Sequence, residues 1–193
     1  MKRVIIVFSL LVMMPAGCAE MSHSTNKDEI AYGELKQMGW TLDYYEQREF
    51  VLTQDDKAKI QKLLGRPLKY YTKNFRYYTE IRRHHGKIGD IIPIYQQTPY
   101  GRLVILVRIG WYSINKIAVV ENVTKETKPI VNDIFLDQFF GKTVSSSFRV
   151  VKTPQDLLTA KDNIKPIAGE PAISQEIADR LQELLAINSV DRF

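Results

Sequence analysis

The sequence has a single cysteine, Cys18, among its 193 residues. A chain with one cysteine can form neither an internal disulfide nor a metal site made of several thiolates. It also lacks a long hydrophobic run, because the stretch from Val4 to Met14 is well short of the ~20 apolar residues needed to cross a bilayer. We therefore expect a fold held by ordinary apolar burial, for which a hydrophobic content of 45% is sufficient.

The motifs of common catalytic sites are absent as well. There is no G-x-S-x-G elbow, no phosphate-binding glycine-rich loop, no H-E-x-x-H and no C-x-x-C. The adjacent His84 and His85 have no third ligand at a suitable spacing, so we expect an exposed turn there and no metal site. These absences disfavour hydrolases, nucleotide triphosphatases and metalloenzymes. They leave open an enzyme whose site is dispersed along the chain.

Two tyrosine pairs and one serine run remain as possible sites. The pairs Tyr70–Tyr71 and Tyr77–Tyr78 could stack on an aromatic ligand, although packing on a half-buried sheet accounts for them equally well. The serines from Ser145 to Ser147 have no basic partner nearby in the sequence, and we expect a loop there.

The first residues have the pattern of an export signal. Met1 to Arg3 are positively charged, Val4 to Met14 are apolar, and Pro15 to Gly17 are small residues directly before Cys18. This leader resembles a bacterial lipoprotein signal peptide with its lipobox, with Pro15 in place of the more usual leucine. The alternatives are a plain secretory signal cut nearby and an uncleaved membrane anchor.

The lipoprotein resemblance implies a compartment and a membrane attachment. Residues 1–17 would be removed, and Cys18 would carry the lipid that anchors the chain in the bacterial cell envelope, facing the periplasm. With Ala19 after the cysteine, the outer membrane is favoured. Residues 18–27 are polar and read as a tether, and residues 28–193 have the size of one domain. Export excludes nucleic acid as a partner despite the formal net charge of +5.

The first half of the domain predicts one helix and a series of strands. Thr53 is a suitable N-cap for a helix over 54–64, and Gly65 is a suitable end. Segments rich in β-branched and aromatic residues predict antiparallel strands over 74–81, 90–95, 102–109 and 114–121. Pro93 indicates an edge strand or a bulge. Residues 103–107 are apolar on both faces, which predicts a strand covered by helices on one side and by another layer on the other.

The second half predicts further helices on this sheet. Helical spacing of apolar residues extends over 128–140 and ends at Gly141, a short strand follows over 147–151, and a helical turn starts at Thr153. In the last helix an apolar stripe consists of Ile173, Ile177, Leu181, Leu184 and Leu185. The side chains expected to face water are Gln175, Glu176, Asp179, Arg180 and Glu183. The fold class is therefore α+β, a single domain with helices packed on an antiparallel sheet.

The order of several segments resembles a known family. The segments are 63–68 (LLGRPL), 86–94 (GKIGDIIPI), the following strand pair and 135–142 (FLDQFFGK). Together they resemble the FMN-binding domain of the peripheral flavin subunits of the Rnf and sodium-pumping quinone reductase complexes. The resemblance covers roughly residues 50–186. It implies an FMN-binding-domain-like fold and electron transfer beside a membrane redox complex.

The late loop of that family departs from its pattern in this chain. In the family a segment I-D-A-I-S-G-A-T-x-x-S carries the threonine that is esterified to the FMN phosphate. Here residues 164–174 read IKPIAGEPAIS, with Pro171 at the acceptor position, Lys165 for aspartate and Glu170 for alanine. Proline has no hydroxyl to esterify. Gly169 and Ser174 agree with the pattern, and Ser174 is the expected N-cap of the last helix.

Two functions are therefore expected from the resemblance. In the first, the domain binds FMN noncovalently near Gly169, Ser174 and Lys142, with Lys165 as a further possible cation, and serves electron transfer at a membrane redox complex. In the second, the domain has lost flavin and acts as a structural or partner-binding lipoprotein of the envelope. The leading expectation is the flavin protein.

Overall fold

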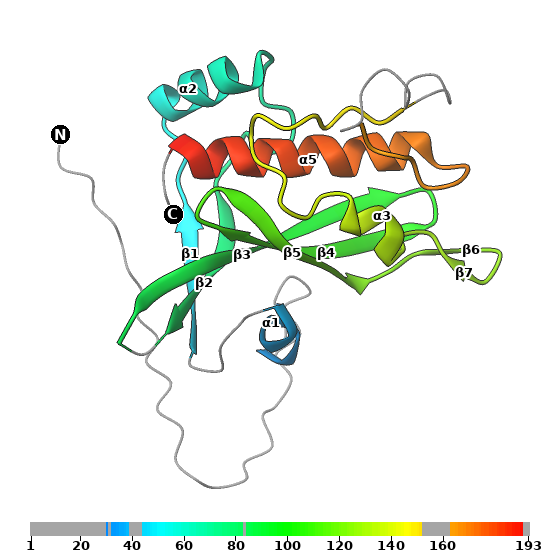
Figure 1. Cartoon of the computed structure of the whole chain (residues 1–193), viewed down its shortest axis with the longest axis horizontal. Helices are drawn as coiled ribbons and strands as arrows, with labels where there is room; N and C mark the ends of the chain where they lie inside the picture. The colour runs from blue at the N-terminus through cyan, green and yellow to red at the C-terminus, as the bar shows by residue number, and fades with distance from the viewer. Residues whose placement is uncertain (1–29, 31, 39–43, 83, 152–162, 191–193) are drawn as a thin grey trace, which may run out of the picture.

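The computed structural model describes residues 30, 32–38, 44–82, 84–151 and 163–190, and its centre is a five-stranded sheet (Figure 1). Each strand pairs antiparallel with its neighbour in the sequence, so the sheet order is β1-β2-β3-β4-β5. The strands are β1 Tyr44–Phe50, β2 Phe75–Arg82, β3 Gly86–Thr98, β4 Gly101–Gly110 and β5 Ser113–Glu121. The leader, Cys18, the tether and the helical turn expected at Thr153 lie outside the described residues.

Helices lie on both faces of the sheet. In Figure 1, α5 (Pro171–Val190) lies between α2 (Gln54–Leu64) and one face, and α1 (Tyr32–Met38) lies against the other. A two-stranded hairpin, β6 Thr124–Lys125 and β7 Lys128–Pro129, and a short helix, α3 Asp133–Asp137, follow β5. The predicted α+β class is confirmed. No helix in the described part of the chain is long and apolar enough to span a bilayer.

The interior strand β4 contributes to two separate apolar cores, as its sequence predicts. Ile105 and Val107 belong to the large core, which includes the apolar stripe of α5. Val104 and Leu106 point the other way, into a smaller core with Met38 of α1. Because side chains alternate along a strand, an apolar run such as this one requires cover on both faces.

The predicted helix over 54–64 is confirmed together with both of its ends. The backbone N–H of Asp56 donates to Thr53 Oγ1 at 3.1 Å, and the N–H of Thr53 donates to Asp56 Oδ2 at 3.2 Å. This reciprocal pair satisfies two of the backbone donors left free at a helix start. Gly65 ends the helix with a positive φ of 66°, a conformation that glycine adopts without steric cost.

The position of Pro93 differs from the sequence prediction. Its strand, β3, is the middle strand of the sheet, and its pairing with Leu106 of β4 is regular. The pairs with β2 end at Ile91, and the irregularity in that ladder lies at Ile81. Pro93 is therefore neither on an edge strand nor at a bulge. It is tolerated because β3 extends beyond the end of its ladder with β2.

Two further predictions in the second half are wrong in extent. The helix expected over 128–140 is limited to α3, because β7 of the β6–β7 hairpin occupies residues 128 and 129. Asn132 is the N-cap of α3, and its side chain accepts from the N–H of Phe135 at 3.0 Å. The strand expected over 147–151 is reduced to one isolated bridge between Val150 and Ile164. In both segments, turns override the apolar periodicity.

The largest departure from the sequence prediction is Glu183. The apolar stripe of α5 is buried as expected, but Glu183, expected to face water, is fully buried. Its carboxylate accepts from the backbone N–H groups of Lys69 and Tyr70, each at 2.9 Å, and of Tyr71 at 3.3 Å. Arg66 Nη1 donates to it at 2.6 Å. One side chain of α5 thus accepts hydrogen bonds from three backbone N–H groups of the connection between α2 and β2. These groups have no partner in a strand ladder.

Replacing Glu183 should therefore cost much of the stability of the domain. We expect Glu183→Gln to lower the free energy of unfolding by about 3 kcal/mol, because it leaves the Arg66 charge without its buried partner. The matched control is Glu176→Gln on the same helix. Its ion pair with Arg180 is partly exposed, so its loss should cost about 0.5 kcal/mol. Urea unfolding followed by circular dichroism measures both, and equal effects would contradict a special role for Glu183.

Candidate functional site

The loop expected to hold flavin leads directly into α5. Helix α5 begins at Pro171, whose fixed φ suits a first helical turn, and the backbone N–H of Ser174 donates to the carbonyl of Glu170 at 3.1 Å. Glu170, and not Ser174, therefore stands directly before the helix. The prediction that Ser174 is the N-cap is wrong, because the helix already starts at Pro171, three residues before Ser174.

The Ser174 hydroxyl is used entirely within the protein. It is fully buried, accepts from the N–H of Ile167 at 2.9 Å and donates to the carbonyl of Glu170 at 2.7 Å. These bonds hold the loop against the first turn of α5. Gly169 is exposed in the turn between them, with a positive φ of 76°. Esterification of this hydroxyl would remove the hydrogen bond that it donates to Glu170.

A negative charge occupies the start of α5. The Glu170 carboxylate accepts from Lys125 Nζ at 2.9 Å and from the Tyr100 hydroxyl at 2.8 Å. The hydrogen bond from Lys125, followed by that from Tyr100, lowers the pKa of the Glu170 carboxyl below its usual value. Glu170 is therefore ionised at neutral pH. An ionised carboxylate here opposes the binding of a phosphate dianion and already engages the cation that would offset it.

The two lysines considered for flavin binding have other contacts. Lys142 Nζ donates to the carbonyl of Ser147 at 2.9 Å and lies 5.6 Å from the centroid of the Phe148 ring. The backbone of Lys165 is held by Gln138, whose side chain accepts from its N–H at 2.7 Å. The structure thus places Gly169 and Ser174 together and Lys142 in a different contact. These residues do not fit covalently attached FMN.

The tyrosine pairs and histidines do not form a site either. Tyr71 and Tyr77 belong to the large core, whereas Tyr78 points into the smaller core on the opposite face. Burial, followed by the nearby Asp90, raises the pKa of Tyr77 to about 12. His84 and His85 are exposed at the β2–β3 turn, as predicted. Among the described residues, no group of metal-binding side chains is present.

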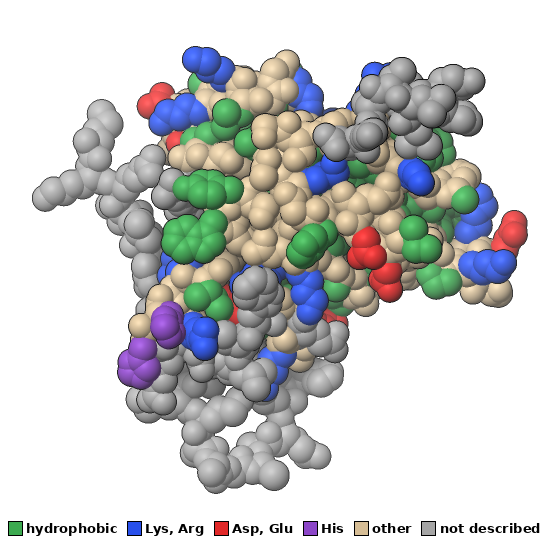
Figure 2. Space-filling model, in the orientation of Figure 1, with side chains coloured by type: hydrophobic (Ala, Val, Ile, Leu, Met, Phe, Trp, Pro, Cys, Tyr) green, Lys and Arg blue, Asp and Glu red, His purple; other side chains and the backbone are tan. Residues whose placement is uncertain are grey.

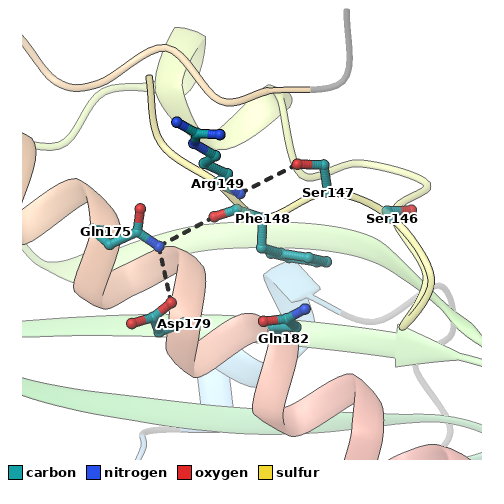
Figure 3. Close-up of a pocket in the computed structure, with 7 residues that line it drawn as sticks. All are labelled: Ser146, Ser147, Phe148, Arg149, Gln175, Asp179 and Gln182. Carbon is teal, nitrogen blue, oxygen red and sulfur yellow. Dashed lines mark hydrogen bonds between the residues drawn. The ribbon is translucent and has the colours of Figure 1, made fainter. Parts of the chain in front are cut away.

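One hollow lies between the loop after α3 and helix α5 (Figure 3). It has a volume of about 350 Å³ and is lined by residues 146–149 together with Gln175, Asp179 and Gln182 of α5. In Figure 3, Gln175 Nε2 donates to the carbonyl of Phe148 at 3.3 Å and to Asp179 Oδ1 at 2.9 Å. Its Oε1 accepts from the N–H of Val150 at 2.9 Å. Gln175 therefore fastens the loop to the helix instead of facing a ligand.

A second hollow lies between the edge strand β5 and helix α3, and we call it the β5–α3 groove. It has a volume of about 430 Å³. Residues 114–117 form its wall on β5, and Asp133, Leu136, Asp137 and Phe140 form the opposite wall. The two walls are held at one end, where the N–H of Gly141 donates to the carbonyl of Ile114 at 2.8 Å.

Exposed apolar side chains lie on the segments that bound this groove. Trp111 is 80% exposed and Tyr112 48% exposed at the β4–β5 turn, directly before the strand that forms one wall. Ile134 is 80% exposed on α3, and Phe140 is 71% exposed on the opposite wall. We call these four residues the apolar rim. Figure 2 shows hydrophobic side chains over the β4–β5 turn and near α3, with acidic side chains beside α3.

Sequence reasoning did not identify the apolar rim. The apolar residues of 130–140 were expected to be one buried helical face, but the five-residue α3 buries only Phe135 and Leu136 of its own residues. One signal in the sequence was the number of apolar residues in 130–140, which is larger than a five-residue helix can bury. The Trp111–Tyr112 pair at a turn was a second signal.

No family model matches the sequence, and no curated protein matches it significantly. The function must therefore be inferred from the residues and their geometry.

The hydrogen bonds of Ser174 indicate that its hydroxyl stabilises the domain, and this role can be tested. We expect Ser174→Ala to lower the free energy of unfolding by about 2 kcal/mol, because the buried N–H of Ile167 loses its acceptor. The control is Ser189→Ala on the same helix, whose hydroxyl only donates to the carbonyl of Leu185 at 2.8 Å. Its loss should change stability by less than about 0.5 kcal/mol. If the two variants unfolded at the same urea concentration, the structural role of Ser174 would be refuted.

Proposed function

We propose that this chain is a lipid-anchored protein of the bacterial envelope whose domain binds a protein partner through the β5–α3 groove and the apolar rim. One observation carries this proposal. Of the seven large hydrophobic side chains exposed in the described part of the chain, four lie on the segments that bound this groove: Trp111 and Tyr112 directly before β5, Ile134 on α3, and Phe140 on the groove wall itself. Clustered apolar exposure around a hollow is typical of an interaction site, whereas isolated exposed residues are not informative.

The chemistry of the rim supports a protein partner. Tryptophan and tyrosine are enriched among the residues that contribute most to protein binding, because they bury a large area with few rotatable bonds. Trp111 and Tyr112 are adjacent at a tight turn between two paired strands, so the sheet positions them. Burying them against a partner removes from water apolar surface that the domain itself leaves exposed.

The leader supports the membrane location. A lipid on Cys18 would keep the domain within reach of other envelope proteins, because the segment between Cys18 and the first described helix is short. Confinement to one surface raises the effective concentration of a partner in the same membrane. A moderate affinity at the groove would then be sufficient for stable association.

The proposal excludes flavin attached at the late loop. We expect the purified chain, coexpressed with a flavin transferase and incubated with FMN, to show no flavin absorption band, because Ser174 Oγ is buried and Glu170 occupies the helix start. A flavoprotein with the intact threonine motif serves as positive control. A band that remains with acid-precipitated protein would reveal covalent flavin, and a band released to the supernatant would reveal noncovalent FMN. Either result would favour the electron-transfer function instead.

Site-specific photocrosslinking in envelope membranes tests the partner-binding function directly. A photoreactive phenylalanine analogue at Phe140 should give a discrete crosslinked product, because this position lies on the groove wall and is exposed. The matched control places the analogue at Leu63, which is 49% exposed on α2, away from the groove. Products at Leu63 equal to those at Phe140, or no product at either position, would refute a docking surface at the groove.

A further inference from the structure

The outer side of β5 is a free edge of the sheet, because β5 pairs with β4 only. A strand at the edge of a sheet presents unpaired N–H and C=O groups along its free side. Natural proteins usually cover such an edge with a helix or a loop. In this domain α3 and the residues after it follow the edge of β5, and the β5–α3 groove separates the two.

The edge of β5 is closed at its first residues, and the strand ends where the β6–β7 hairpin begins. At one end the N–H of Ile114 donates to the carbonyl of Lys142 at 3.0 Å. Beyond the other end the chain leaves the strand and enters the β6–β7 hairpin, where the N–H of Ile130 donates to the carbonyl of Val123 at 2.9 Å. Between these points, no backbone hydrogen bond reaches the outer side of residues 117–120 from any other part of the chain that the structure describes.

The register with β4 indicates which backbone groups are open. Ile114 turns its N–H and C=O outward, toward residues 141 and 142. Asn115 has no partner in the ladder with β4. Beyond it, Lys116 pairs with Arg108, and the pairing continues regularly to Val119 with Ile105. Because the groups of successive residues in an antiparallel strand alternate in direction, Ile117 and Val119 turn theirs outward as well. These two residues offer two donors and two acceptors in a row.

The groove beside this edge carries unbalanced negative charge. Asp133 and Asp137 lie one turn apart on α3, and both line the groove. Neither forms an ion pair with another described residue. Lys116 also lines the groove but is engaged in a further interaction. A basic group entering the groove would find carboxylates without a partner.

From this arrangement we infer that the partner contributes an extended segment of alternating apolar and basic residues, which adds to β5 as a sixth strand. This inference rests on the proposed partner-binding function and specifies how the partner is recognised. The backbone of the segment bonds to Ile117 and Val119, its basic side chains face Asp133 and Asp137, and its apolar side chains contact the apolar rim. Backbone bonds supply affinity in this mode, and the flanking side chains supply selectivity.

A lipid surface accounts for fewer of these features. Exposed tryptophan and tyrosine do suit the interface of a bilayer. The headgroups of a bilayer, however, cannot pair with a row of strand donors and acceptors in register. Anionic headgroups would also be repelled by Asp133 and Asp137. A protein segment uses the open edge, the carboxylates and the apolar rim together.

Peptide binding to the full-length chain tests this inference. The probe is a peptide of about eight alternating valine and lysine residues, long enough to form one strand. We expect it to bind and to slow hydrogen exchange at the amides of Ile117 and Val119, which become hydrogen-bonded. The amide of Ala118, which points toward β4, should be unaffected. A peptide with the same side chains but N-methylated on alternate residues should not bind.

Charge variants test the recognition by the groove. We expect Asp133→Asn with Asp137→Asn to weaken binding of the lysine peptide roughly threefold to tenfold, because two exposed charge contacts are lost. The matched control, Asp55→Asn on α2, should leave binding unchanged. A glutamate version of the peptide that bound as tightly as the lysine version would overturn the inference.

Two further outcomes separate this inference from the proposed function. If the lysine peptide fails to bind while the Phe140 crosslink persists, strand addition is refuted and partner binding stands. If the fluorescence of Trp111, in a Trp40→Phe background, is quenched by vesicles of brominated phosphatidylethanolamine and phosphatidylglycerol while the amide exchange of Ile117 is unchanged, the surface binds lipid and strand addition is refuted. Loss of both peptide binding and crosslink would refute both proposals.

Discussion

The buried carboxylate of Glu183 is the interaction on which the arrangement of the helices depends. It accepts three consecutive backbone N–H groups and one guanidinium, all from the connection between α2 and β2. A carboxylate out of water is tolerated only where donors replace its hydration. Because those donors are fixed to the sheet through β2, Glu183 sets both the rotation and the axial position of α5. At the other end of α5, Ser174 fixes the first turn to the preceding loop.

This fixed position of α5 decides what the late loop can do. Near the helix start at Pro171, the Ser174 hydroxyl holds the loop and Lys125 pairs with Glu170, so neither side chain is available to a phosphate. A resemblance of sequence segments describes the order of elements, whereas binding depends on the side chains of one loop. In this chain the order of the segments predicts a flavin domain, whereas the side chains of the late loop oppose flavin attachment. We therefore propose that the function lies at the β5–α3 groove, along the outer edge of β5.

Sequence reasoning succeeded where one physical rule acts alone. The N-cap and the terminal glycine predicted α2, the apolar stripe predicted α5, and β-branched and aromatic residues between turns predicted the four strands from β2 to β5. Sequence reasoning failed where a local contact competes with periodicity, as at Asn132, which starts α3 late, and at Pro171, which starts α5 early. The burial of Glu183 could not be predicted, because its partners lie more than a hundred residues away. The apolar rim was missed for a different reason: its apolar residues are visible in the sequence, but the sequence does not distinguish an exposed Phe140 from a buried one.

The dimensions of α3 and β5 explain why the edge remains open. A five-residue helix extends roughly 7 Å, whereas a nine-residue strand extends roughly 30 Å, so α3 can cover only part of the edge. An open edge normally invites aggregation, and charged residues are one means of preventing it. Lys116 and Glu121 are exposed on either side of the open residues of β5. An apolar strand from an unrelated chain would have to desolvate these charges, whereas a segment with basic groups for α3 recovers part of that cost. In the proposed binding mode, Lys116 and Glu121 oppose unspecific pairing, and Asp133 and Asp137 select a basic segment.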